Sequence, residues 1–354
     1  MGEKMDKWGA VNTKLTKEDG VSRTTVVVCV LAGVLIAGVL FVVGMYAAEP
    51  VIDEYLQTKQ IYQLYDFYDQ DIGSTQTAVY FIGSSVVGDA VHCREIDQYL
   101  QNAGYNISTY NLLMDGDTPL RRLPQIQNII ESHPSFVVIG VTYRSVTDEQ
   151  WVDETVILVN EKLRINSNAS QFYSPEELHD LKQKPDLRYK VRFLRSVLMP
   201  YRDTWGNDGI SYAKDPFIVI SNDRRTANIL AEDIQKQAND PSDKWRPVVP
   251  AEMTRHKQAL IYNVQTLQDA GIPVVLINMP LHPLFSEKIT DESRQNFFDL
   301  LNETGAKWYD MEFAYDEEYF RDSHHASLEG GTFFSQDMAK LIISEVESGA
   351  VHYT

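Results

Sequence analysis

Two hydrophobic patterns run along the 354 residues of this chain. The first is one continuous apolar run, Val26–Ala48, which contains no charged side chain. About 20 apolar residues in a helix are enough to cross the hydrocarbon core of a bilayer. The run exceeds the usual apolar core of a cleaved signal peptide, and Tyr46-Ala47-Ala48 lacks the small-x-small pattern of a cleavage site. We therefore expect a transmembrane signal-anchor helix at residues 24–48.

The charges that flank this run predict its orientation. Residues 1–23 carry five Lys and Arg side chains, whereas residues 49–71 carry only Lys59. The more basic flank of a membrane helix tends to stay in the cytoplasm. The pattern therefore predicts a single-pass protein of the cell membrane, with a cytoplasmic tail at 1–23 and an extracytoplasmic C-terminal domain.

The second pattern is an alternation of short apolar runs and amphipathic segments beyond residue 76. Helix-like segments lie at about 90–103, 119–132, 251–269, 289–303 and 329–347. The apolar runs have the length of buried strands and lie at Thr77–Ile82, Ile107–Leu113, Phe136–Val141, Ile272–Met279 and Lys307–Met311. Such alternation predicts βαβ units and a parallel sheet covered by helices on both faces. We expect a three-layer α/β/α flavodoxin-like sandwich over residues 77–348, preceded by the one transmembrane helix.

Two segments stand outside this alternation. Residues 49–76 place apolar side chains near helical spacing, which predicts a helical stalk that packs on the domain or on a second copy of the chain. Residues 146–250 are polar and too long for a loop of a compact domain. We interpret them as an insertion over the carboxyl edge of the sheet, where α/β folds bind ligands. A peripheral decoration, unrelated to substrate, is the alternative.

Charge and cysteine content narrow the range of functions. The formal net charge of −18 argues against nucleic acid as a partner, because phosphate binding needs clustered Lys and Arg. The two cysteines, Cys29 and Cys93, lie one inside the apolar run and one far beyond it. We therefore expect no internal disulfide between them.

Candidate catalytic residues lie where the predicted strands end. Gly83-Ser84-Ser85 ends the first, Asp115-Gly116-Asp117 follows the second, Gly140-Val141-Thr142 ends the third, and Asp322-Ser323-His324-His325 precedes the last helix. In a parallel sheet these blocks converge on one edge. Asp322 and His325, three residues apart on one loop, suit a base with its orienting carboxylate. With Ser85 as nucleophile they make a possible Ser/His/Asp set, which is recognised by roles and geometry.

The four blocks, in this order, resemble the SGNH (GDSL-type) hydrolase superfamily over roughly residues 77–347, the insertion excepted. The resemblance implies that Ser85 is the nucleophile of the family's Gly-Asp-Ser block, and that Asp322 and His325 form its Asp-x-x-His block. It also implies an oxyanion hole to which the backbone N–H groups of Ser85 and Gly116 contribute. The expected reaction is acyl transfer at an ester.

This chain departs from the family pattern at two blocks. Gly-Asp-Ser reads Gly83-Ser84-Ser85, and Gly-x-Asn-Asp reads Gly140-Val141-Thr142-Tyr143. Thr142 thus replaces the asparagine that donates to the oxyanion in the family. Loss of one such donor typically costs about 3–4 kcal/mol of transition-state stabilisation. The Thr142 hydroxyl or a donor from the insertion could substitute for it.

A metal site is the less favoured interpretation of the same loop. Asp322, His324 and His325, together with Asp115 and Asp117, are metal-ligating residue types. Adjacent histidines usually project in different directions, and no second histidine motif completes a site. We expect neither a metal nor another cofactor.

The preferred hypothesis is a membrane-anchored extracytoplasmic serine esterase or acyl hydrolase that acts on an acylated glycan or lipid of the cell surface. Two alternatives stay open: a catalytically inactive envelope binding protein of the same fold, which the missing asparagine at Thr142 suggests, and an O-acyltransferase component of a polysaccharide-modifying assembly. A homo-oligomer or a partner in such an assembly is compatible with each. Arg121, Arg122 and Arg144 either hold an anionic substrate at the rim or are solvated surface residues.

Overall fold

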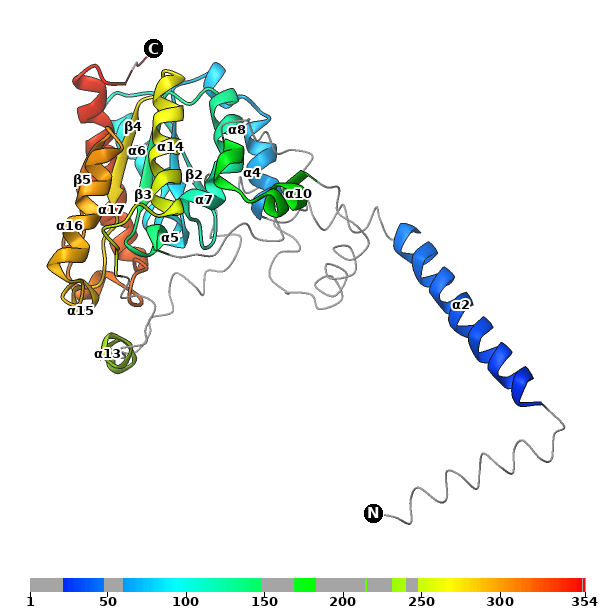
Figure 1. The fold of residues 1–354 in the computed structure, drawn as a ribbon. Coiled ribbons are helices and arrows are strands. Elements are labelled where there is room, and N and C mark those ends of the chain that lie inside the picture. The colour runs from blue at the N-terminus through cyan, green and yellow to red at the C-terminus, as the bar shows by residue number, and fades with distance from the viewer. Residues whose placement is uncertain are drawn as a thin grey trace.

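The computed structural model of the chain describes residues 22–47, 60–147, 169–182, 214, 231–239, 248–351 and 353. A sheet of five parallel strands forms the centre of the C-terminal part (Figure 1). Its strands, in chain order, are β1 (Ala78–Gly83), β2 (Ser108–Leu113), β3 (Phe136–Val141), β4 (Val274–Asn278) and β5 (Lys307–Asp310). The α/β fold with a central parallel sheet, which the alternation of apolar runs predicts, is confirmed.

The strand order is β2-β1-β3-β4-β5, so the topological switch point of the sheet lies between β1 and β3. The chain moves from β1 to β2 on one side and then returns to β3 on the other side of β1. In open parallel sheets, the crevice at the carboxyl ends of such a strand pair is the usual place of a ligand site. Ser85 follows β1 and Thr142 follows β3, so both residues flank this crevice.

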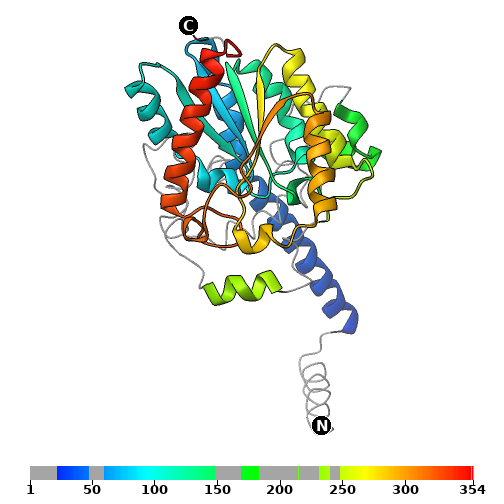
Figure 2. The ribbon, with the colours of Figure 1, turned by 90° about the vertical axis from the view of Figure 1, so that its left-hand side faces the viewer.

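Helices cover both faces of the sheet and make three layers. Figure 2 shows α17 on one side of the strands and α14 and α16 on the other. One face carries α5 (Ser85–Ala90), α6 (Cys93–Asn102) and α17 (Leu328–Glu347). The other carries α4 (Gln60–Tyr68), α7 (Pro119–Arg122), α8 (Ile126–Glu131), α14 (Arg255–Asp269) and α16 (Asp291–Glu303). Every residue of β1 and β4 is buried, as expected for strands covered on both faces.

Local sequence explains where these helices begin and where one of them breaks. Thr254, Thr290 and Ser327 precede α14, α16 and α17, and each side chain accepts a hydrogen bond from the backbone N–H three residues on. The helix predicted at 119–132 is divided into α7, a 3₁₀ turn and α8. Pro124 lies in that turn. Because proline has no N–H and restricts the residue before it, a continuous helix is disfavoured there.

One helix among the described residues, α2 (Arg23–Ala47), is long and apolar enough to cross a membrane. Its most apolar window has a mean hydropathy of 3.2, and no residue of that window is buried. The helix agrees in length and position with the anchor expected at 24–48. Residues 1–21 of the expected cytoplasmic tail lie outside the described residues, so the orientation stays a prediction.

Parts of the expected stalk and insertion pack on the domain. Helix α4 lies within the segment 49–76, and its Leu64, Tyr65 and Tyr68 are buried in the core. Of the segment 146–250, the structure describes a 3₁₀ turn (Ala169–Phe172), α10 (Pro175–Lys182), α13 (Ala231–Asn239) and a few further residues. The buried Tyr173 donates a hydrogen bond of 3.1 Å to the carbonyl oxygen of Leu120. Most of the expected insertion lies outside the described residues.

Candidate active site

A tight turn from β1 into α5 carries Ser85. Ser84 caps α5, its side chain accepting a 3.4 Å hydrogen bond from the backbone N–H of Val86, and Ser85 is the first helical residue. A Cβ atom at Gly83 would lie 2.4 Å from the side chain of Val87 and 2.9 Å from the carbonyl oxygen of Gly140. Only glycine fits this turn, which holds the Ser85 side chain at the carboxyl edge of the sheet.

The structure brings Ser85, His325 and Asp322 into one chain of hydrogen bonds. His325 Nε2 lies 2.9 Å from Ser85 Oγ, and His325 Nδ1 lies 2.7 Å from Asp322 Oδ2. An ionised carboxylate can only accept, so this arrangement assigns the imidazole proton to Nδ1 and leaves Nε2 to accept from the serine hydroxyl. These are the atoms and distances that proton transfer from a serine to a histidine requires.

Asp322 is held as an anion by its neighbours. Its Oδ1 atom accepts hydrogen bonds from the backbone N–H groups of His324 and His325, at 3.0 and 2.8 Å. Burial by itself raises the pKa of this carboxyl, but the hydrogen bond and the charge of His325, with a smaller contribution from His324, outweigh burial. The net effect is a pKa far below the usual range.

The loop that carries Asp322 and His325 is itself braced. The backbone N–H of Arg321 donates to the carbonyl oxygen of His325 at 3.0 Å, and Phe320 and Ala326 form an antiparallel bridge. The Arg321 side chain forms a buried ion pair with Asp89 on α5, the helix that begins with Ser85. The ion pair thus attaches the loop of His325 to α5, the same helix that carries Ser85. Sequence reasoning missed it, because its two residues are 232 positions apart.

His324 lies beside His325 but does not replace it. The two ring centres are 3.9 Å apart, and His324 Nδ1 lies 2.7 Å from Ser323 Oγ. Burial, helped by the charge of His325, lowers the pKa of His324 well below its usual value, and this keeps the ring neutral. Of the two adjacent histidines, His325 is the one whose hydrogen bond reaches Ser85.

Among the described residues, Asp322, His324 and His325 are the group of side chains best placed to hold a metal ion. One ligand atom from each lies within 4.8 Å of the others. Coordination through Asp322 Oδ2 or His325 Nδ1 would replace the 2.7 Å hydrogen bond that joins these atoms. The cluster supplies three ligands at most, fewer than the four protein ligands of a structural zinc site.

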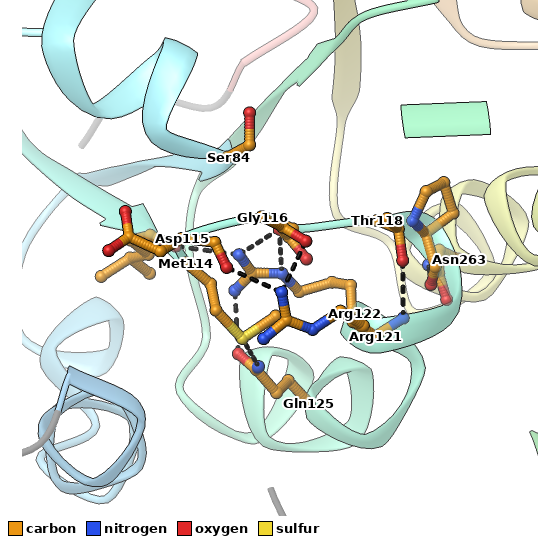
Figure 3. A network of polar contacts seen from close by, with 12 residues as sticks. Ser84, Met114, Asp115, Gly116, Thr118, Arg121, Arg122, Gln125 and Asn263 are labelled. Carbon is orange, nitrogen blue, oxygen red and sulfur yellow. Dashed lines mark hydrogen bonds and ion pairs between the residues drawn. The ribbon is translucent and has the colours of Figure 1, made fainter. Parts of the chain in front are cut away.

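The turn that carries Gly116 lies against the Ser85 turn. The backbone N–H of Met114 donates to the carbonyl oxygen of Gly83 at 2.9 Å, and Gly116 adopts a φ of +62°, a conformation that favours glycine. Arg121 Nη1 donates to the carbonyl oxygens of Asp115 and Gly116, at 2.7 and 2.5 Å (Figure 3). In the described part of the chain, the N–H of Gly116 has no acceptor.

The contact with Arg121 also determines where the N–H of Gly116 points, because the peptide bond is planar. The carbonyl oxygen of Asp115 and the N–H of Gly116 belong to the same trans peptide and point in opposite directions. Because the carbonyl points toward Arg121, the N–H points away from it. The guanidinium therefore fixes the direction of the Gly116 N–H, which has no acceptor among the described residues, close to the turn that carries Ser85.

Thr142 lies in a turn that leaves its hydroxyl proton available. Its Oγ1 atom accepts from the backbone N–H of Ser145 at 3.2 Å, and its own N–H donates to Ser145 Oγ at 3.1 Å. A threonine hydroxyl that accepts one bond can still donate one. Thr142 is therefore a fixed side chain with one donor to offer.

Arg121 and Arg122 do not have the roles that the sequence suggested. They are 8 % and 3 % exposed, so they are neither solvated surface residues nor open to an anionic substrate. Arg122 forms a buried ion pair with Asp117 and donates to the side chain of Gln125 at 2.8 Å (Figure 3). Both arginines are interior supports of the loop between β2 and α7.

Comparisons with known proteins give few matches in sequence and several in structure. A protein-family model matches residues 251–347, and no curated protein matches the chain. A psychrotrophic esterase from Pseudoalteromonas sp. has 10 % identity and a TM-score of 0.37, with 77 % of this chain and 100 % of that chain covered.

Two further structures are similar to a comparable extent. A catalytic mutant of an acetylxylan esterase from Geobacillus stearothermophilus has 11 % identity, a TM-score of 0.37 and coverage of 75 % of this chain and 93 % of that chain. The SGNH-hydrolase family esterase AlinE4 has 13 % identity, a TM-score of 0.31 and coverage of 78 % and 95 %. All three structures are described as esterases, and one of them as a member of the SGNH-hydrolase family.

Proposed function

We propose that this chain is a membrane-anchored serine esterase of the SGNH type, which hydrolyses acyl esters outside the cytoplasm. The observation that supports it best is the pair of hydrogen bonds from Ser85 to His325 and from His325 to Asp322, at 2.9 and 2.7 Å. Each group has the partner that its role needs: the hydroxyl has a base, and the base has an anion that orients it.

Acylation begins when Ser85 Oγ attacks the carbonyl carbon of the ester. The hydroxyl proton passes to His325 Nε2, and the electron pair of the carbonyl moves to its oxygen. Asp322 stabilises the imidazolium that forms, and its depressed pKa keeps it ionised throughout. When the tetrahedral intermediate collapses, the proton on His325 passes to the leaving alcohol and Ser85 retains the acyl group.

The oxyanion is bound by donors around the crevice between β1 and β3. Ser85 is the first residue of α5, where its N–H has no carbonyl of the helix to bond. The N–H of Gly116, held by Arg121, is the second donor, and the hydroxyl of Thr142 is the third. Thr142 thus takes the place of the asparagine that this chain lacks.

Deacylation repeats these steps with water. His325 accepts a proton from the water as its oxygen attacks the acyl carbon, and the proton then returns to Ser85 Oγ as the carboxylic acid leaves. An alcohol in place of water would give acyl transfer with the same atoms. The membrane anchor and the basic tail favour an acylated glycan or lipid of the cell surface as the substrate.

Hydrolysis of p-nitrophenyl acetate by the full-length chain in detergent tests this proposal. We expect activity in the unchanged protein and its loss in the Ser85→Ala variant, with Ser84→Ala as the matched control on the neighbouring residue. Activity that survives in Ser85→Ala contradicts the mechanism. The absence of activity in a folded, unchanged protein would favour a second candidate function, that of a non-catalytic binding protein. Such a protein would have lost its activity when Thr142 replaced the asparagine of the family pattern.

A further inference from the structure

A buried carboxylate, that of Glu312, contacts the residue after Thr142 and has no part in the mechanism proposed above. Glu312 follows β5 at the carboxyl edge of the sheet, and its side chain is fully buried. The hydroxyl of Tyr143 donates a hydrogen bond of 2.6 Å to Glu312 Oε2. We infer that Glu312, acting through Tyr143, positions the Thr142 hydroxyl for the oxyanion, an inference that rests on the proposed esterase function.

Glu312 also contacts the other elements at this part of the sheet edge. Its Oε1 and Oε2 atoms accept hydrogen bonds of 2.9 and 3.0 Å from Nη2 and Nε of Arg294 on α16. Its carbonyl oxygen accepts a hydrogen bond of 3.2 Å from the backbone N–H of Leu281, which lies beyond the end of β4. One residue after β5 therefore joins the turn that follows β3 to α16 and to the segment that follows β4.

Burial and charge keep the donors of this network protonated. Burial, together with the hydrogen bond to Glu312 and its charge, raises the pKa of the Tyr143 hydroxyl. The hydrogen bonds to Glu312 raise the pKa of Arg294 although burial opposes them. A hydrogen bond to an ionised acceptor is shorter and stronger than one between neutral groups. The carboxylate of Glu312 therefore holds the Tyr143 hydroxyl more firmly than a neutral acceptor would.

The position of Tyr143 sets the position of the Thr142 turn. The hydrogen bonds between Thr142 and Ser145 are internal to the turn, so they fix its shape. The Tyr143 side chain, by contrast, joins the turn to the domain: its ring lies 4.4 Å from that of Phe297 on α16, centre to centre, and its hydroxyl bonds Glu312. Because the peptide between Thr142 and Tyr143 is planar, fixing one residue restricts the other.

A double-mutant cycle on kcat for p-nitrophenyl acetate, with the full-length chain in detergent, tests this inference. Tyr143→Phe removes the hydroxyl and keeps the ring contact with Phe297. We expect kcat to fall by about threefold to tenfold, less than for loss of a whole oxyanion donor, with little change in KM. In the Thr142→Val background the same change should lower kcat no further, because Tyr143 acts through the Thr142 hydroxyl. Independent effects would multiply instead.

The matched control is Tyr309→Phe, which removes the same kind of hydrogen bond away from Thr142. The Tyr309 hydroxyl donates to the buried Glu345 at 2.8 Å, and Lys307 forms an ion pair of 2.5 Å with the same carboxylate. This variant should leave kcat of the folded protein unchanged. Thermal unfolding, measured in parallel for every variant, corrects kcat for the folded fraction.

A second variant, Glu312→Gln, keeps the size of the side chain and removes its charge. It should also lower kcat only while Thr142 is present, and it serves if Tyr143→Phe does not fold. Wild-type kcat in folded Tyr143→Phe contradicts the inference, as do losses that multiply in the double variant or an equal loss in Tyr309→Phe. Lack of activity on every ester in the folded, unchanged protein contradicts the proposed function itself and is thereby distinguished.

Discussion

Arg121 donates a hydrogen bond of 2.5 Å to the carbonyl oxygen of Gly116 and another of 2.7 Å to that of Asp115. A buried arginine is thus used to hold two consecutive peptide groups, whereas its usual partners are carboxylates and phosphates. The charge also polarises the peptide between Asp115 and Gly116, because hydrogen bonds in series strengthen one another. In the proposed mechanism, the N–H of this peptide would therefore be a better donor to the developing oxyanion.

The Arg121→Met variant should lower kcat for p-nitrophenyl acetate by about tenfold to a hundredfold, because a misdirected donor loses part of what a whole oxyanion donor supplies. KM should change little, since the interaction develops in the transition state. Arg121→Lys, which keeps the charge but cannot bond both carbonyls in the same geometry, should recover part of kcat. Thermal unfolding measured in parallel separates the catalytic effect from lost stability. A kcat that falls only with the folded fraction would mean a purely structural arginine.

The Thr142 hydroxyl is expected to replace the absent asparagine. Thr142→Val keeps the shape and removes the donor, so kcat should fall by about tenfold or more, whereas Thr142→Ser should keep most of the activity. Thr142→Val also removes an acceptor from the N–H of Ser145. Ser145→Ala disturbs the same turn without removing the proposed donor, and it is therefore the matched control. If both variants lower kcat equally, the effect belongs to the turn and not to the hydroxyl.

The Asp322→Asn variant replaces the carboxylate oxygen that faces His325 Nδ1 with an amide nitrogen. An amide nitrogen facing Nδ1 would donate to it and place the imidazole proton on Nε2, where it blocks acceptance from Ser85. We expect kcat to fall by about 10³–10⁴-fold while the loop stays folded. The Asp310→Asn variant, at the carboxylate on β5 that bonds Asn278, is a control for charge removal near the sheet edge. Asp322→Asn with near-normal kcat would exclude the orienting role.

Because two histidines are buried, we expect the free energy of unfolding to decrease in mild acid. Burial lowers the pKa of His282 and, further, that of His324. Below about pH 6.5 the unfolded chain therefore takes up protons that the folded chain refuses, at up to about 1.4 kcal/mol per pH unit for each histidine. Asp322, with a lowered pKa, has the same sign in a lower window: its contribution is complete above about pH 4 and is lost as pH falls further.

The His324→Asn variant checks this assignment through its unfolding midpoint as a function of pH. Between about pH 6.5 and 4.5 it should lose part of the wild-type slope, because one of the two buried histidines has gone. The steeper fall below about pH 4, which comes from Asp322, should stay. An unchanged slope between pH 6.5 and 4.5 would show that His324 titrates normally in the folded protein.

The sequence predicts the fold well where one physical signal dominates. The strand Phe136–Val141 has its predicted bounds, because a central strand of a covered parallel sheet is a continuous apolar run. The edge strand Lys307–Asp310 ends one residue before its predicted end. The break of the predicted 119–132 helix had a visible cause in Pro124. Ser85, His325 and Asp322 were selected because they follow strand ends or share one loop, and because their blocks occur in the order of the SGNH pattern. The structure joins the three side chains by hydrogen bonds, and their catalytic roles are the proposal made above.

The supports of the site were not predictable from the same signals. The sequence suggested that Arg121 and Arg122 either contact an anionic substrate or lie on the solvated surface, because arginine is rarely buried. Their burial depends on partners in three dimensions, such as the carbonyl groups of the 115–116 turn and Asp117. The ion pair of Asp89 with Arg321 joins segments 232 residues apart, and no local spacing indicates it.

Covalent labelling of the full-length chain in detergent with a fluorophosphonate probe, followed by mass spectrometry of its peptides, tests the central claim most directly. The Ser85–His325–Asp322 hydrogen bonds predict an adduct on Ser85, lost in Ser85→Ala and formed much more slowly in Asp322→Asn, while Ser84→Ala is labelled normally. A folded protein whose Ser85 stays unlabelled, or a label found on another serine, would contradict the assignment of Ser85 as an activated nucleophile.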